Sequence, residues 1–413
     1  MKNYLTAAFL LLIAVSPAWA DPEWKASLSV SEEYNDNVKE ERHGEEDFVT
    51  SVRPGLSYRH EGARTLLETN YRGTWNHYAS GSRDQEFNHD AMLHGLLNAW
   101  EDFFFLDLRD TYRLVNQDRT RGEAVEEDST VDQLQQNIFT FSPYITPRFG
   151  ERGQAKVGYA YSNIWYDEDD RDSKNIHRGF VDGEYELSGQ TALLSGYSYT
   201  QELWEDETLD RNILYLGGRY AYAENGVVYL KAGPQHTRYR DSDTSSSSLF
   251  WDAGLDHDFG TVLLHLNTGV SFEDDPDTGE TYERKFGTLR LTKTWSRTTA
   301  SVYSTLEEYE DRSDDGDDGD DGDDGEKVRR TLLGMSLSHE LSERLTASMG
   351  LIYDFQDRSD DDTRRWYANA GLNYALSERV GLGCWYRFKD SSSDDEEEEY
   401  QVNRVGVQLT MTF

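Results

Sequence analysis

Apolar and polar residues alternate along several stretches of this chain. The alternation is clearest at residues 24–31, 261–272, 365–374 and 404–413. In the first stretch Trp24, Leu28 and Val30 share one face, and Ser27 and Ser29 share the other. Successive side chains of a β-strand point to opposite faces, whereas a helical repeat fits none of these stretches. The pattern therefore predicts strands with one apolar and one polar face.

Two kinds of link alternate between the predicted strands. Nine short turns lie near 60–63, 101–102, 146–153, 188–190, 224–226, 258–260, 296–297, 341–344 and 376–379. Ten longer charged segments lie at 35–46, 79–86, 115–131, 167–175, 202–211, 240–247, 274–281, 310–328, 357–364 and 390–398. Together they join about 20 strands, and weak strands such as 132–144 leave 18 or 22 as alternatives. An even number places both termini at the end that carries the short turns.

Composition turns this pattern into a fold class. The chain has 26 Tyr, 17 Phe and 10 Trp, yet its net charge is -38 and its mean hydropathy is -0.80. Many aromatic residues with low hydropathy are typical of a barrel that is apolar toward lipid and polar inside. We therefore predict an all-β, antiparallel, up-and-down transmembrane β-barrel with short periplasmic turns and long acidic extracellular loops. A barrel this wide encloses a water-filled lumen unless a segment folds into it.

Both ends of the chain carry features of an exported outer-membrane protein. Lys2, the apolar run that follows it and a small-residue cleavage signal at 18–20 predict a Sec-type signal peptide at 1–20. Residues 21–413 would then form a single barrel domain in a Gram-negative outer membrane. The last predicted strand ends in Phe413, which resembles the signal read by the outer-membrane assembly machinery. Membrane lipid and lipopolysaccharide are the further partners that we expect.

The acidic residues concentrate in the long loops. The extreme case is SDDGDDGDDGDDGEK within 310–328, an acidic, low-complexity segment. Glycine spacing and like-charge repulsion favour a solvated loop there. A Ca²⁺ site is the weaker alternative, because an EF-hand alignment puts Gly319 where a ligand is needed. Such a rim repels polyanions, so we expect neither nucleic acid as a partner nor a cofactor.

Twelve charged residues of the predicted strands fall on the inner face and are candidates for lining a pore. They are Arg53, Arg72, Arg109, Arg113, Arg219, Arg290, Arg365, Arg387, Arg404, Glu68, Asp107 and Asp256. Paired across strands, they would form ladders that keep the wall polar. Gathered at one depth, they would form a constriction that selects solutes. The spacing allows both arrangements.

The chain offers little for catalysis. His89, Asp90 and His94 form a local cluster, but on a strand His89 faces away from the other two. A hydrolytic site needs a base oriented toward its nucleophile, so we predict that the protein is not an enzyme. Cys384 is the single cysteine, which argues against a disulfide scaffold, a cysteine-rich metal centre and a haem attachment motif.

Three segments resemble a known family. LSVSEEYNDNV (28–38), FVTSVRPGLSYRHEGARTLLETNYRGTWNHY (48–78) and FNHDAMLHG (87–95) resemble the bacterial β-barrel porin family of the outer membrane. More narrowly, they are similar to the outer-membrane proteins associated with PEP-CTERM/exosortase and exopolysaccharide gene clusters. The matching pieces are Tyr34, Asp36, Asn37, Arg53-Pro54-Gly55-Leu56 and the repeated Leu-Ser-Glu-Arg turns. The resemblance implies a barrel without catalytic residues and a role in polysaccharide secretion.

Three functions follow as hypotheses. The first is a porin-like channel, with passage of an extracellular polysaccharide as one use. Tyr367 and Trp385, which share the inner face with Arg365 and Arg387, would then offer an aromatic track. The second is a non-conducting structural or surface-interaction barrel whose acidic loops contact matrix or a partner. The third is a sheath for an electron-transfer partner, which requires an open lumen.

Overall fold

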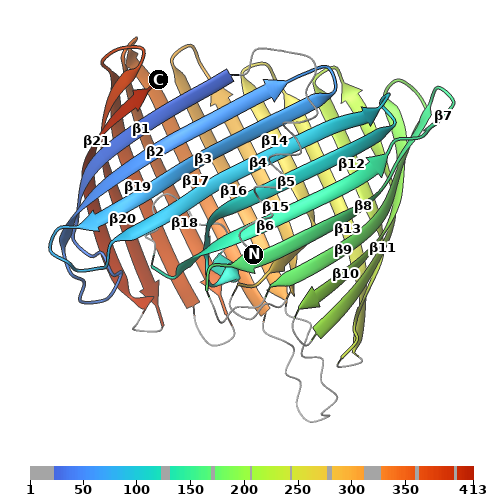
Figure 1. Ribbon diagram of the computed structural model, residues 1–413, viewed down its shortest axis with the longest axis horizontal. Coiled ribbons are helices and arrows are strands. Elements are labelled where there is room, and N and C mark those ends of the chain that lie inside the picture. Colours follow the sequence, from blue (N-terminus) through green and yellow to red (C-terminus); the bar gives the residue numbers. More distant parts are fainter. Residues whose placement is uncertain are drawn as a thin grey trace.

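The protein folds as one closed β-barrel (Figure 1). The computed structural model describes residues 23–121, 131–168, 173–204, 207–241, 244–276, 281–310, 327–358, 362–394 and 398–413. Within them, 20 long antiparallel strands and the two-residue strand β7 share one sheet. The sheet closes where β1 pairs with β21, from Ser27 opposite Thr412 to Asn35 opposite Arg404. The predicted fold class and strand number are confirmed. The predicted signal peptide and the acidic repeat lie outside the described residues.

Each long strand pairs with the next long strand along the chain. The strands are β1 (Glu23–Asn35), β2 (Asp47–Glu61), β3 (Thr65–Tyr78), β4 (Glu86–Trp100), β5 (Phe104–Asn116), β6 (Gln133–Ile145), β7 (Arg148–Phe149), β8 (Gly153–Tyr166), β9 (Lys174–Glu186), β10 (Thr191–Trp204), β11 (Glu207–Ala223), β12 (Gly226–Tyr239), β13 (Ser245–Asp258), β14 (Val262–Asp274), β15 (Thr281–Thr294), β16 (Thr298–Glu310), β17 (Lys327–Ser342), β18 (Leu345–Asp357), β19 (Asp362–Ala375), β20 (Val380–Ser393) and β21 (Tyr400–Thr412). A 3-10 turn, η1 (Arg119–Arg121), lies between β5 and β6. No helix in these described ranges is long and apolar enough to cross a membrane.

The predicted links agree with the structure except at one long loop. All nine predicted short turns join consecutive long strands, and β7 lies within the turn at 146–153. The prediction of a long loop at 202–211 is wrong, because β10 runs to Trp204 and β11 starts at Glu207, with these two residues opposite each other. Charged side chains did not end the pairing here. A ladder that continues beyond the apolar belt can carry charges, since water solvates them there.

The two faces of the sheet differ as the alternation predicts. Leu214, Leu216 and Leu230 point outward and are 52%, 71% and 53% exposed. On the inner face of the same strands, Arg211 and Gln235 are only 5% and 2% exposed. The apolar side chains thus form the outer surface, and many charged and polar side chains are buried within the barrel. This distribution is the inverse of a water-soluble protein and is typical of a transmembrane barrel.

Tyrosine hydroxyls on the outer face are paired with acceptors on the neighbouring strand. Tyr197 donates to Asn212 Oδ1 at 2.7 Å, and Tyr386 donates to Asn403 Oδ1 at 2.7 Å. Each ring therefore presents its apolar body outward while its polar tip is satisfied within the sheet. This arrangement suits aromatic residues at a membrane boundary, where one end of the side chain is apolar and the other is wet.

Aromatic rings on the inner face cover glycines on the adjacent strand. Tyr303 lies opposite Gly334, and a Cβ atom at Gly334 would fall 2.1 Å from the Tyr303 ring. The same arrangement occurs at Tyr215 with Gly196, Tyr229 with Gly254, Phe180 with Gly158, and Trp385 with Gly406. Glycine is required at these positions because the ring occupies the space of its side chain. The rings consequently lie against the wall and leave the lumen clear.

Replacing one of these glycines should destabilise the barrel. Gly334→Ala forces the Tyr303 ring off the wall, and we expect it to lower the free energy of unfolding by about 1–3 kcal/mol, the usual cost of overpacking. Gly179→Ala in β9 is the control, since a Cβ atom there meets nothing within 4 Å. Denaturant titration in detergent measures both. Equal stability of the two variants would contradict the role given to the ring.

Candidate functional site

The lumen is the candidate functional site, and its two ends differ. We call the end with the nine short turns the short-turn end and the other the long-loop end; they lie at the top and bottom of Figure 1. Near the short-turn end, inner-face charges are paired but open to water. Asp256 lies 2.5 Å from His265, and their side chains are 61% and 50% exposed. Arg59 lies 3.2 Å from Glu68, and the arginine side chain is 55% exposed.

Seven of the twelve predicted lumen residues lie in the short-turn half or at mid-height. They are Glu68, Arg72, Asp107, Arg109, Arg219, Asp256 and Arg290. The structure brings two of them together, because Arg109 donates to both carboxylate oxygens of Asp107 at 3.1 Å each. Arg72 pairs with Asp90 at 2.9 Å, and Arg219 pairs with Glu184. These contacts are ladder-like and mostly exposed.

Five further predicted residues lie in the long-loop half or at mid-height. They are Arg53, Arg113, Arg365, Arg387 and Arg404. Arg365 is 3% exposed and donates to Gln356 Oε1 at 3.1 Å and to Glu398 Oε2 at 3.0 Å. Arg387 lies 4.0 Å from Glu33. The twelve residues are therefore distributed along the lumen instead of forming one ring at a single depth.

A buried ladder of acids and arginines, which sequence analysis did not single out, crosses five strands in the long-loop half. It consists of Glu273, Arg284, Glu307, Arg330 and Asp354, one from each of β14 to β18. Arg330 binds Asp354 with two hydrogen bonds of 2.8 and 2.9 Å and reaches Glu307 at 3.2 Å. Arg284 donates to Glu307 at 3.0 Å and lies 3.3 Å from Glu273. The signal was present in the sequence, since acid and arginine alternate on successive predicted strands.

The loop between β1 and β2 folds inward at the long-loop end. Val38 is 1% exposed and packs against Val49 and Tyr78 on the inner face of β2 and β3. Two residues further on, Glu40 accepts a hydrogen bond from Lys389 Nζ at 2.7 Å on the inner face of β20. The loop thus joins both flanks of β1 and covers part of the lumen.

A second segment crosses the mouth from the far side. Thr120 in η1 accepts a hydrogen bond of 2.6 Å from Gln356 of β18, although the two residues are 236 positions apart. Beside it, Arg358 forms an ion pair with Asp118. Burial opposes ionisation of this carboxyl, but the Arg358 guanidinium and a hydrogen bond from Thr120 outweigh it and hold the pKa of Asp118 below its usual range. η1 is therefore attached to the opposite wall by charge and by hydrogen bonds.

A third segment, the tip of the β14–β15 hairpin, also lies inside. We define the hairpin tip as the described residues 270–276 and 281–283. Tyr166 of β8 donates to Asp274 Oδ2 at 2.7 Å, and Lys174 of β9 donates to Thr281 Oγ1 at 2.9 Å. β8 and β14 are separated by five strands in the sheet, so these contacts cross the lumen. The long-loop end is thereby narrowed by three segments.

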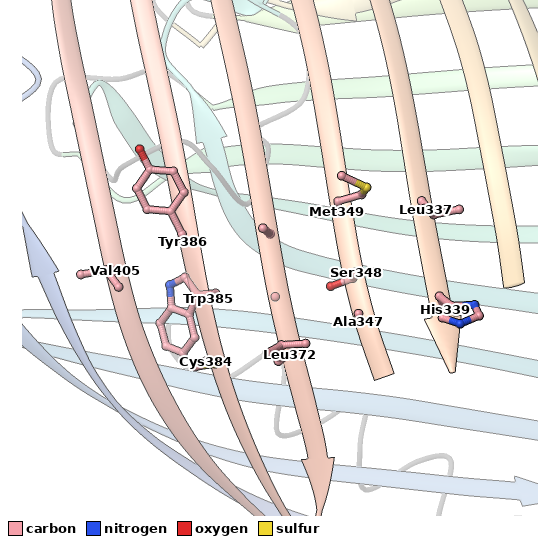
Figure 2. A pocket seen from close by; sticks show the side chains of 12 residues that line it. Leu337, His339, Ala347, Ser348, Met349, Leu372, Cys384, Trp385, Tyr386 and Val405 are labelled. Carbon is pink, nitrogen blue, oxygen red and sulfur yellow. The ribbon is translucent and has the colours of Figure 1, made fainter. Parts of the chain in front are cut away.

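A groove of about 510 Å³ lies on the outward face of β17 to β21 (Figure 2). Leu337, Met349, Leu372 and Tyr386 line it, and Figure 2 shows them along neighbouring strands together with Cys384. The lining is almost wholly apolar, and the groove opens away from the lumen. Hydrocarbon fits this surface, whereas a polar solute does not.

The histidine cluster considered for catalysis is divided between the two faces. His89 points outward and is joined to Tyr71 Oη at 3.0 Å. His94 points inward and lies 3.3 Å from Asp107, while Asp90 pairs with an arginine. Within the described ranges, no group of three or more His, Cys, Asp or Glu side chains could hold a metal ion. The Ca²⁺ alternative for the acidic repeat concerns residues outside those ranges.

Comparison with known proteins supports the barrel fold. A family model described as "Putative beta-barrel porin 2" matches residues 325–413, the part of the chain that contains β17 to β21. No curated protein matches the chain. The FrpB iron transporter of Neisseria meningitidis (F3-3 variant) superposes with a TM-score of 0.50 at 10% identity, covering 98% of this chain and 83% of that one. The ferric-catecholate import receptor Fiu of E. coli K12 gives a TM-score of 0.50 at 9% identity, with 96% and 82% covered.

Breaking the buried ladder should cost far more stability than breaking an exposed pair. Arg330→Met leaves Glu307 and Asp354 as buried charges without their cation, so we expect the free energy of unfolding to fall by about 3–5 kcal/mol. Arg72→Met is the matched control, because the exposed pair with Asp90 is worth about 0–1 kcal/mol. Denaturant titration in lipid vesicles measures both changes. Equal losses would show that the long-loop half is as hydrated as the rest of the lumen.

Attachment of η1 should depend on pH in a defined direction. The pKa of Asp118 is depressed in the folded protein, so its ion pair contributes fully at neutral pH and down to about pH 4, the ordinary aspartate range. The contribution is lost only as the pH falls below that range and Asp118 becomes protonated. Hydrogen exchange of the 119–121 amides measures it, and Asp118→Asn should remove the dependence. Release near pH 6 would contradict the assignment.

Proposed function

We propose that the protein is a porin-like channel of a Gram-negative outer membrane, with its short-turn end toward the periplasm. The observation that carries this proposal is the difference between the two ends of the lumen. Exposed charge pairs such as Asp256 with His265 line the short-turn half, whereas three inward segments narrow the long-loop half. A solute would enter a hydrated vestibule from the periplasm and meet the restriction near the cell exterior. The apolar outer face and the terminal match to a porin family model support placement in that membrane.

We further propose a neutral or mixed-charge polymer, such as an extracellular polysaccharide, as the solute. Lumen rings of Tyr229, Tyr303 and Trp385 lie against the wall and offer flat faces on which sugar rings can stack. Arginine and lysine beside them supply hydrogen-bond donors, as Arg290 does 4.8 Å from the Tyr303 ring centre. Tyr367 is less suited than the sequence suggested, because it is only 5% exposed beneath Lys389. The association with PEP-CTERM and exopolysaccharide loci, implied by the sequence resemblance, fits this solute.

A non-conducting structural barrel is the second candidate. The buried, mutually paired ladder from Glu273 to Asp354 favours it, because such a network stabilises a static wall. A sheath for an electron-transfer partner fits less well, since Thr120 and the hairpin tip occupy space that a partner inside the lumen would need.

Conductance in planar bilayers separates the two candidates. We expect the wild-type protein to give small, well-defined current steps, and deletion of 37–45 in the inward β1–β2 loop to enlarge them. Deletion of 314–325 is the matched control, because it shortens a different long loop and should alter ion selectivity more than step size. The absence of steps in all three proteins would overturn the channel and favour the structural barrel.

A further inference from the structure

The barrel wall is interrupted between β13 and β14 at the long-loop end. The register of these strands runs from Asp258 opposite Leu263 to Asp252 opposite Gly269 and then stops. Above that point β13 continues to Ser245 in register with β12, and β14 continues to Asp274 in register with β15. The two strands therefore part company while each remains paired on its other side.

Beyond this point the hairpin tip lies behind β8 to β13, inside the barrel. The Arg211 guanidinium lies 3.3 Å from the centre of the Phe272 ring, and Val270 is only 7% exposed. Glu283 accepts hydrogen bonds from Gln235 at 2.8 Å and from Ser248 at 3.3 Å. The face of the tip that continues the outward face of lower β14 is thus pressed against the inner face of the opposing strands.

The sequence also fits a second position for the same tip, in the wall. Continuing the β13–β14 register would place Trp251 opposite Val270 and Leu249 opposite Phe272. Val270 and Phe272 would then point outward, in line with Leu264 and Leu266, beside Leu249, which is 59% exposed. The apolar alternation that predicts a lipid-facing strand over 261–272 is satisfied only in that position.

Each position satisfies a different set of groups. Inside the lumen, Lys174 holds the tip through Asp274 and Thr281, and its ammonium also lies 3.8 Å from Glu202. In the wall, five further residues of β14 would join the ladder with β13, and two apolar side chains would face hydrocarbon. Buried ion pairs contribute little net stability, and ladder hydrogen bonds contribute modestly, so the two positions are close in free energy.

We propose that the hairpin tip is a gate, which moves between the lumen and the wall and so sets the width of the long-loop end. Lys174 is the latch of the closed position. When the tip joins β13, the contacts of Tyr166, Arg211 and Gln235 with it are released, and the space that it occupied becomes part of the lumen. The gate regulates the channel proposed above and rests on that function for its purpose, but its movement can be tested independently.

Disulfide trapping tests the movement. In a Cys384→Ser background, the pair Leu249→Cys with Phe272→Cys should be oxidised to a crosslink only when the tip is in the wall. The pair Leu255→Cys with Leu266→Cys is the matched control, because these residues are opposite each other on the same two strands in the paired region. We expect full crosslinking of the control and partial crosslinking of the gate pair in lipid vesicles.

A latch variant and a reciprocal pair sharpen the test. Lys174→Met should raise the crosslink yield of the gate pair severalfold. It should also lower the bridging of Gln235→Cys with Glu283→Cys by a short bis-thiol reagent, which reports the inward position. This second pair keeps the proposal testable if the first variant folds poorly. A control crosslink without any gate-pair crosslink, or Lys174→Met variants with unchanged yields at both pairs, would overturn the gate.

Conductance distinguishes failure of the gate from failure of the channel. Oxidation of the gate pair should enlarge the current steps, and bridging of Gln235→Cys with Glu283→Cys should reduce them. Trapping without current at any pair would leave the movement established and overturn the channel. Currents that are the same in both trapped forms would overturn the gate and leave the channel intact.

Discussion

Closure of the sheet is the constraint on which the rest of the structure depends. Hydrocarbon offers no hydrogen-bond partners, so a strand that crosses it must be paired on both sides, and the register between β1 and β21 removes the last two edges. Twenty strands that close in this way form a wide cylinder. Every second side chain then points into an interior that side chains alone cannot fill. The wide interior, and the need to manage it, follow from the closure.

The protein manages its interior differently at the two ends. Near the short turns, water solvates charges such as Asp256, so single cross-strand pairs suffice there. Near the long loops, inward segments exclude water, and buried charges must be satisfied by one another. The bidentate contact between Arg330 and Asp354 answers that need. Dense charge pairing and inward loops are therefore two aspects of one solution.

The sequence was sufficient for the wall and insufficient for what lies inside it. Strand alternation and turn position are local properties, which is why 20 strands and nine short turns could be predicted. Inward parity was also readable, but parity gives no depth, so the twelve charged residues could not be sorted between an open and a narrowed half. The contact of Thr120 with Gln356 joins residues 236 positions apart, and no local pattern predicts it. The interruption after Gly269 was invisible for the opposite reason, since the alternation there predicts an uninterrupted strand.

The aromatic rings that cover glycines have a geometric consequence. Where Tyr303 covers Gly334, one side chain occupies the volume of two, and the other pairs of this kind repeat the arrangement around the wall. At those places the bore is set by the backbone circumference, with protruding side chains contributing little. A long molecule threaded through the barrel would slide past a smooth lining, and its friction would come from stacking instead of from steric steps.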